Sequence, residues 1–141
     1  MNPPGKNLQA IAVKVESPDD YSVGNISALL AEIATLLEKF IATGEGAEID
    51  LKSLPMGPLE YEQLRLTLGQ GEVSANLEAI GPSEIIETKY PGVWWVTHYN
   101  VEGDIVADLI EIARIPSLLQ SQQEDMQAGL ERLRMMLEEQ T

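Results

Sequence analysis

The stretch that decides the fold is Gly71-Glu72-Val73-Ser74-Ala75-Asn76-Leu77-Glu78-Ala79. Its apolar and polar residues alternate, and a two-residue period is typical of a strand with one buried face. After a Gly-Pro turn at 81–82, strand-like segments follow at 84–90, 93–101 and 105–112, separated by Pro-Gly and Glu-Gly-Asp turns. The sequence therefore predicts an antiparallel meander of about four strands.

Helical patterns precede this meander. Apolar residues recur at three- and four-residue spacing from Ile26 to Ile41, with Asn25 as the expected cap and Gly44 as the expected stop. Pro58 and Gly69 bound a second, shorter helix. A helix pair ahead of a meander indicates the α+β class, in which the helices pack on the sheet.

A long helix is also expected after the strands. Ser117 or Ser121 is its expected cap, and Ser121 with Glu124 forms a capping-box pair. The expected apolar stripe of this helix is Leu119, Met126, Leu130, Leu133 and Leu137. Such a stripe fits packing on the sheet, and it also fits self-association.

The remaining segments suggest one domain over residues 1–141, with about 1–7 and 138–141 frayed. A strand is expected at 8–16 with a turn at 17–20, and a short extended piece at 49–51. The first residues lack the apolar region of a signal peptide, and no run reaches the ~18 apolar residues of a spanning helix. We therefore expect a cytoplasmic protein.

Composition excludes several kinds of chemistry. The 141 residues carry a formal net charge of −14, with no cysteine and one histidine. This acidity disfavours binding to nucleic acid or anionic lipid. Without thiolates the chain cannot hold an Fe–S cluster by the usual ligands or use a cysteine nucleophile, and one histidine excludes a multi-histidine metal centre. We expect no cofactor and no metal site.

Half of the net charge lies in the predicted sheet. Residues 71–111 contain eight acids and one base, Lys89. Outward positions of a half-exposed sheet are normally polar, so this acidity can serve solubility alone. Alternatively, the acids form a docking surface for a basic partner, because clustered like charges cost stability that mixed charges would not.

The segment 93–101 carries both tryptophans and the histidine. Alternation places Trp95 on the presumed core face and Trp94 with His98 on the outward, acidic face. A half-exposed tryptophan beside carboxylates would suit a protein contact. The alternative is that the terminal helix covers this face and buries Trp94.

These considerations give a candidate binding surface and no catalytic residue. Its members are Glu72, Glu84, Glu87, Trp94, His98 and Glu102. His98 lacks an evident nucleophile or further metal ligands, and a lone strand histidine is usually a hydrogen-bonded structural residue.

Several sequence words together resemble a known family. They are Leu68-Gly69-Gln70-Gly71-Glu72-Val73-Ser74-Ala75, Ser83-Glu84-Ile85-Ile86-Glu87-Thr88 and Pro91-Gly92-Val93-Trp94. Ile49-Asp50-Leu51-Lys52-Ser53-Leu54-Pro55 and Ile115-Pro116-Ser117 fit the same pattern. From about Ile26 to Leu137 the chain resembles the conserved region of the HupH/HyaF hydrogenase-expression proteins.

The resemblance implies a non-enzymatic accessory protein or chaperone in the maturation of an uptake [NiFe] hydrogenase. Its implied partners are the Fe–S small-subunit precursor, before twin-arginine export, and other maturation proteins. The acidic sheet could attract a basic leader segment. Two alternatives remain: a small enzyme using Glu and His98, or a self-associating structural domain in which a homo-oligomer forms.

Overall fold

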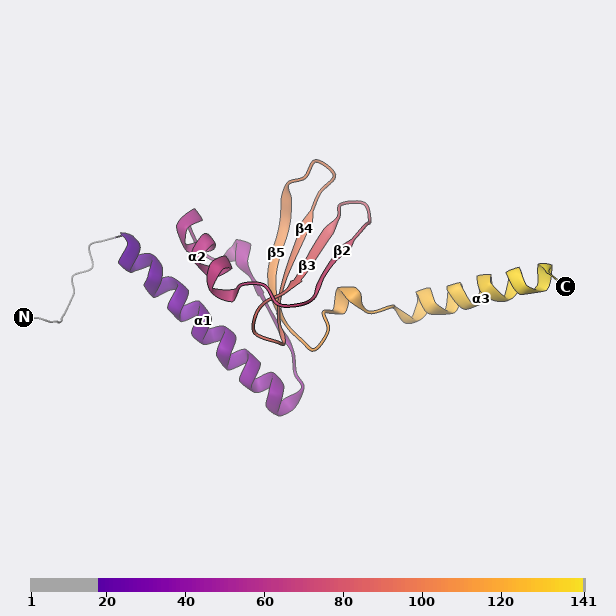
Figure 1. Ribbon diagram of the computed structural model, residues 1–141, viewed down its shortest axis with the longest axis horizontal. Coiled ribbons are helices and arrows are strands. Elements are labelled where there is room, and N and C mark those ends of the chain that lie inside the picture. The colour runs from indigo at the N-terminus through magenta and orange to yellow at the C-terminus, as the bar shows by residue number, and fades with distance from the viewer. Residues whose placement is uncertain (1–17, 141) are drawn as a thin grey trace, which may run out of the picture.

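The computed structural model describes residues 18–140 and confirms the α+β class. Helix α1 (Pro18–Thr43), strand β1 (Ala47–Asp50), the 3-10 turn η1 (Leu51–Ser53) and helix α2 (Pro58–Leu68) come first. Strands β2 (Ser74–Leu77), β3 (Ser83–Glu87), β4 (Val93–Tyr99) and β5 (Ile105–Ile112) follow. The 3-10 turn η2 (Ser117–Leu119) and helix α3 (Gln123–Glu139) complete the described chain (Figure 1).

The sheet has five antiparallel strands in the order β1-β5-β4-β3-β2. The meander is confirmed, and β1 adds a fifth strand, because the short extended piece pairs with β5 from Ala47 opposite Ile112 to Asp50 opposite Leu109. This pairing joins residues about 60 positions apart, which local periodicity does not reveal. The expected strands at 71–79, 84–90 and 93–101 are shorter in the structure, whereas β5 has its expected bounds.

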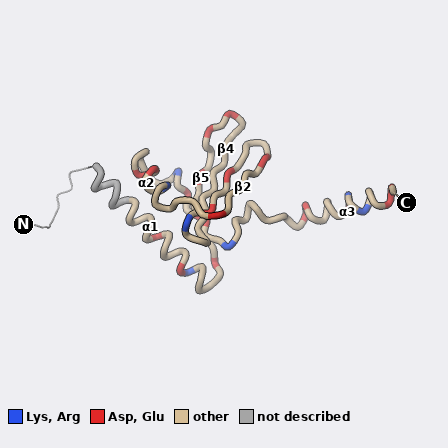
Figure 2. The backbone as a smooth tube through the Cα atoms, in the orientation of Figure 1, with Lys and Arg blue, Asp and Glu red and all other residues tan. Residues whose placement is uncertain are grey.

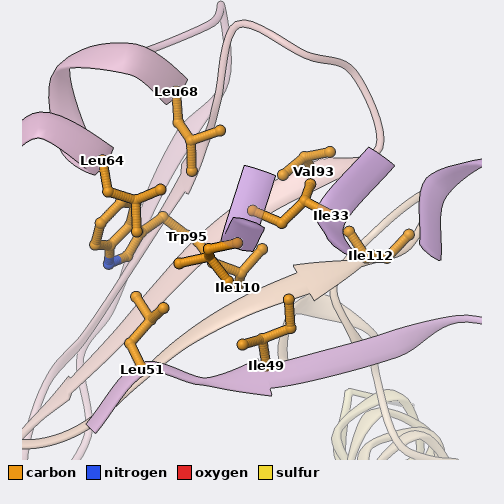
Figure 3. Packing of buried hydrophobic residues seen from close by; sticks show 10 residues of the cluster. Ile33, Ile49, Leu51, Leu64, Leu68, Val93, Trp95, Ile110 and Ile112 are labelled. Carbon is orange, nitrogen blue, oxygen red and sulfur yellow. The ribbon is translucent and has the colours of Figure 1, made fainter. Parts of the chain in front are cut away.

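One face of the sheet packs on α1 and α2 and forms the main core. Its strand residues are Ile49, Val93, Trp95, Ile110 and Ile112. Leu29 and Ile33 of α1 and Leu64 and Leu68 of α2 pack against them (Figure 3). We call this the helical face. The expected core position of Trp95 is confirmed.

A buried carboxylate lies on the helical face. Asp108 is only 2% exposed. Its oxygens accept hydrogen bonds from Trp95 Nε1 (2.7 Å), Thr97 Oγ1 (2.9 Å) and the Tyr61 hydroxyl. Arg65 lies with its guanidinium carbon 4.2 Å from the centre of the Trp95 ring. Three donors replace the water that burial removes from the carboxylate.

The opposite face, the second face, carries a smaller cluster of Ile85, Trp94 and Val96. Leu118 of η2 packs against this cluster, and the Trp94 indole donates to the Ala113 carbonyl at 3.0 Å. The turn that follows β5 therefore covers part of the second face.

Helix α1 differs from its expected start. The helix begins at Pro18, not after a cap at Asn25, so the turn expected at 17–20 is wrong over its described part. Proline suits the first position of a helix because its missing N–H would be unbonded there. The expected stop is confirmed: Gly44 has φ +78° and donates to the Phe40 carbonyl at 2.7 Å. The strand expected at 8–16 and the expected frayed residues 1–7 lie outside the described residues.

Helix α3 projects away from the sheet (Figure 1). It begins at Gln123 with Gln122 as its cap, so neither Ser117 nor Ser121 has the expected capping role. Ser117 and Leu119 belong instead to η2. None of the 17 residues of α3 is buried. Among the described residues no helix has the length and apolar character needed to cross a membrane.

Candidate protein-binding surface

Two hairpin turns come together at one end of the sheet. They are residues 78–82, between β2 and β3, and residues 100–104, between β4 and β5. The Tyr99 N–H donates to the Pro82 carbonyl at 2.9 Å. Gly81 has φ +75°, and a Cβ at this position would collide with the Tyr99 carbonyl oxygen. Only glycine fits this close approach, which holds the two turns side by side.

The second turn is organised by one side chain. Asn100 Oδ1 accepts hydrogen bonds from the backbone N–H of Glu102 (3.0 Å) and of Asp104 (2.9 Å). Gly103 has φ +90° and donates to the Asn100 carbonyl. This Asx-type turn fixes the backbone from which Val101, Glu102 and Asp104 project.

The side chains at these turns are apolar and acidic. Ile80 is 95% and Val101 71% exposed. Glu78, Glu102 and Asp104 are exposed and form no ion pair with a base of the described residues. Figure 2 shows acidic positions in red, and no basic position in blue, at the hairpin ends of the sheet. We call these five residues the hairpin-tip surface. Exposed apolar side chains within a polar, charged rim are typical of protein-binding surfaces.

The residues of the sequence-predicted surface divide between the two ends of the sheet. Glu84 and His98 lie near the hairpin tips, and Glu102 lies in the second turn. Glu87 and Trp94 face each other at the far end of β3 and β4. Glu72 lies beside them, since its N–H donates to Glu87 Oε1 at 3.1 Å.

The acids also divide between the two faces, contrary to the single acidic face expected. Glu84 lies opposite Thr97 on the helical face, whereas Glu87 lies opposite Trp94 on the second face. Asp108 and Glu111 are buried, and a Glu111 oxygen accepts a hydrogen bond from the Ser117 N–H. Alternation alone could not show this, because it does not reveal which acids receive internal donors.

Trp94 does not have the exposed position expected of a binding anchor. It is 5% exposed, since Leu118 packs against its cluster and its indole is bonded to Ala113. The alternative of a buried Trp94 therefore holds. The segment that covers it is the short turn η2, and the long terminal helix expected in that role lies elsewhere.

His98 is half-buried and pairs with a serine. Its Nδ1 lies 2.6 Å from Ser83 Oγ. A serine–histidine contact is one element of nucleophilic catalysis, but Ser83 is itself buried and does not present its hydroxyl to a substrate. The described residues contain no group of three or more His, Asp or Glu arranged to hold a metal ion.

Sequence reasoning missed Ile80, Val101 and Asn100. A signal was available for Ile80, which stands between the alternating stretch that ends at Ala79 and the Gly-Pro turn at 81–82. Val101 was predicted to end a strand, directly before the Glu-Gly-Asp turn. Apolar residues beside turns lie at the margin of the sheet, so they are candidates for contacts with another molecule.

The fold and this surface define the chain as a small acidic α+β domain with an exposed helix at its carboxyl end. A family model described as "HupH hydrogenase expression protein, C-terminal conserved region" matches residues 23–140. The chain belongs to this family, which confirms the resemblance found in its sequence.

Named relatives agree with this assignment. The chain is 32% identical over 97 residues to the hydrogenase expression/formation protein HoxQ of Azotobacter vinelandii, covering 69% of this chain and 34% of that protein. It is 31% identical over 111 residues to the hydrogenase expression/formation protein HupH of Rhizobium leguminosarum bv. viciae, covering 78% of this chain and 39% of that protein. The chain thus spans well under half the length of these relatives.

A solved structure shares both fold and family. The hydrogenase expression protein HupH from Thiobacillus denitrificans ATCC 25259 superposes with a TM-score of 0.79 at 41% sequence identity. The match covers 82% of this chain and 97% of that one.

Proposed function

We propose that this chain is a non-enzymatic accessory protein in the maturation of an uptake [NiFe] hydrogenase, acting in the cytoplasm. Its membership of the family supports a role in hydrogenase maturation, as do the names of its relatives. Its partner is the Fe–S small-subunit precursor, with other maturation proteins as further contacts. The absence of cysteine supports protein binding over cluster carriage.

The hairpin-tip surface is the observation that carries the binding proposal. It offers two exposed apolar side chains beside three exposed carboxylates, on turns that hydrogen bonds of the backbone and of Asn100 hold in place. A basic segment with neighbouring apolar residues, such as a twin-arginine leader, complements this chemistry. Glu84 and His98 lie beside the surface and extend it. Glu72 and Glu87 form a second acidic group at the far end of the sheet.

Charge reversal tests this proposal. We expect the triple variant Glu78→Lys, Glu102→Lys, Asp104→Lys to capture the small-subunit precursor at least about tenfold more weakly at low salt. The matched control is Glu32→Lys, Glu38→Lys, Glu62→Lys, because it changes the net charge equally at exposed positions of α1 and α2. Binding is measured with purified precursor at low and moderate salt.

The two triple variants must differ for the proposal to stand. An equal loss of precursor binding in both variants would show an effect of net charge alone. If both variants kept full binding, the hairpin-tip surface would not be the binding site. Glu72→Lys helps to locate the site, because Glu72 lies at the far end of the sheet. If the precursor binds at the hairpin tips, this variant should weaken precursor binding less than the hairpin-tip variant does. Loss of maturation in cells carrying His98→Ala, with precursor binding retained, would favour the enzymatic alternative built on the contact of His98 with Ser83.

A further inference from the structure

Helix α3 exposes an apolar stripe that belongs to neither buried cluster of the described chain. Met126, Leu130, Leu133 and Leu137 remain 51%, 40%, 51% and 53% exposed. A 17-residue helix alone in water is only marginally stable, since amphipathic helices gain most of their stability by packing their apolar face. We therefore expect the stripe to pack against a surface of another molecule.

The spacing of the stripe identifies the kind of partner. Its residues follow one another at intervals of four, three and four, which are alternating d and a positions of a heptad. These four positions form the narrow seam of a helix pair, with Met136 beside it, whereas packing on a sheet uses a wider face. The partner is therefore another helix of similar pattern.

We propose that α3 pairs antiparallel with α3 of a second copy of this chain. In this arrangement a two-fold axis passes between Leu130 and Leu133, so that Leu130 layers on the partner's Leu133. Met126 then layers on the partner's Leu137. The same patch serves both copies, as closed two-fold dimers require.

Residues beside the seam support the antiparallel direction. Arg134 and Gln127 occupy e positions, and Glu131 lies next to them on the same flank of the helix. Antiparallel helices bring equal flanks together, so Arg134 faces the partner's Glu131. On the other flank the small Gly129 faces the large side chain of the partner's Met136. The parallel alternative brings Arg134 to the flank that carries the partner's Arg132, where like charges repel.

The first test measures the oligomeric state of the full chain by sedimentation over a wide range of protein concentrations. We expect a reversible monomer–dimer equilibrium, because two heptads give a short seam. Leu133→Asp should raise the dimer dissociation constant by about tenfold or more. Met135→Asp is the matched control, since it adds the same charge to the same helix at an exposed position away from the seam. Its effect should be small.

The second test is the direction of pairing. Arg134→Glu should weaken an antiparallel dimer, and adding Glu131→Arg should restore it. The chain has no cysteine, so any disulfide that forms must join the introduced cysteines. A mixture of Gln127→Cys and Arg134→Cys variants should form the mixed disulfide in preference to either symmetric one.

Three outcomes would overturn the proposal. A strictly monomeric chain that Leu133→Asp destabilises would show that α3 packs on its own body. A monomer whose stability Leu133→Asp leaves unchanged would point to a different protein as the partner. A dimer strengthened by Arg134→Glu would be parallel. None of these outcomes bears on capture of the precursor by the hairpin-tip surface.

Discussion

Asp108 shows how a single residue departs from its sequence pattern. An acid in a strand is normally assigned to the exposed face, yet Asp108 is buried among Tyr61, Trp95 and Thr97. Strand alternation correctly placed Trp95 on the core face, and Thr97 lies two residues further along β4 on the same face. It could not show that their donor groups, with a tyrosine from α2, converge on one carboxylate, because that depends on how α2 crosses the sheet.

The hydrogen bond from Tyr61 should make stability depend on pH. Burial raises the pKa of Tyr61 to about 12, and the hydrogen bond and the charge of Asp108 add to the effect. Because the unfolded-state pKa is about 10, the neutral phenol is favoured in the folded chain. Its contribution to the free energy of unfolding is complete below pH about 10 and is lost as the pH rises through about 12.

Tyr61→Phe isolates this contribution. The variant should lose about 1–3 kcal/mol at neutral pH, because Asp108 keeps only two of its three donors. The difference from the unmodified chain should shrink above pH about 10. Urea unfolding at several pH values measures both effects. Tyr90→Phe, at an exposed position, is the control. Equal stability of the two variants would show that the bond to Asp108 has little net value.

Among the elements, β5 and β2 show what periodicity can predict. β5 has the expected bounds, and it is an interior strand that pairs with β1 on one side and β4 on the other. β2 is an edge strand and is shorter than its pattern, with Val73 and Leu77 partly exposed. The alternating pattern covers 71–79, but only its middle part forms a strand, because few side chains cover this edge of the sheet.

The turn η2 has the covering role that the sequence offered to the terminal helix. The sequence placed Ser117 and Leu119 at the start of that helix, and its alternative for Trp94 was burial under the long apolar stripe. The structure gives that role to η2, because Leu118 follows β5 so closely that the chain turns directly onto the second face. Which apolar element covers a face depends on the path of the connecting backbone, and composition does not encode that path.

Removing the Leu118 side chain tests the role of η2. Leu118→Ala should lower the free energy of unfolding by about 1–2 kcal/mol, less than for a fully buried leucine. It should also shift tryptophan fluorescence to longer wavelength as Trp94 becomes hydrated. Leu119→Ala, in the same turn at a more exposed position, should change neither property. A fluorescence shift of equal size in both variants would indicate that the whole turn has detached.

For the whole molecule, the question is whether the charge of −14 serves only solubility. Solubility requires net charge and no particular placement. The hairpin tips instead gather Glu78, Glu102 and Asp104 on two adjacent turns with no ion-paired base among the described residues. Like charges that lie close together repel, so this placement should reduce stability at low salt.

Neutralising these acids should therefore separate stability from binding. We expect Glu78→Gln, Glu102→Gln, Asp104→Asn to raise the urea midpoint slightly at low salt, by relieving repulsion, and to weaken precursor capture. Glu32→Gln, Glu38→Gln, Glu62→Gln removes equal charge from the exposed surfaces of α1 and α2, where acids are spread along two helices. It should raise the midpoint less and leave capture intact.

Equal gains in stability, with capture unchanged in both variants, would mean that the acids at the hairpin tips serve solubility alone. A gain in stability joined to a loss of capture at the tips would show that this charge is retained for binding, since a sequence selected for stability would have spread it.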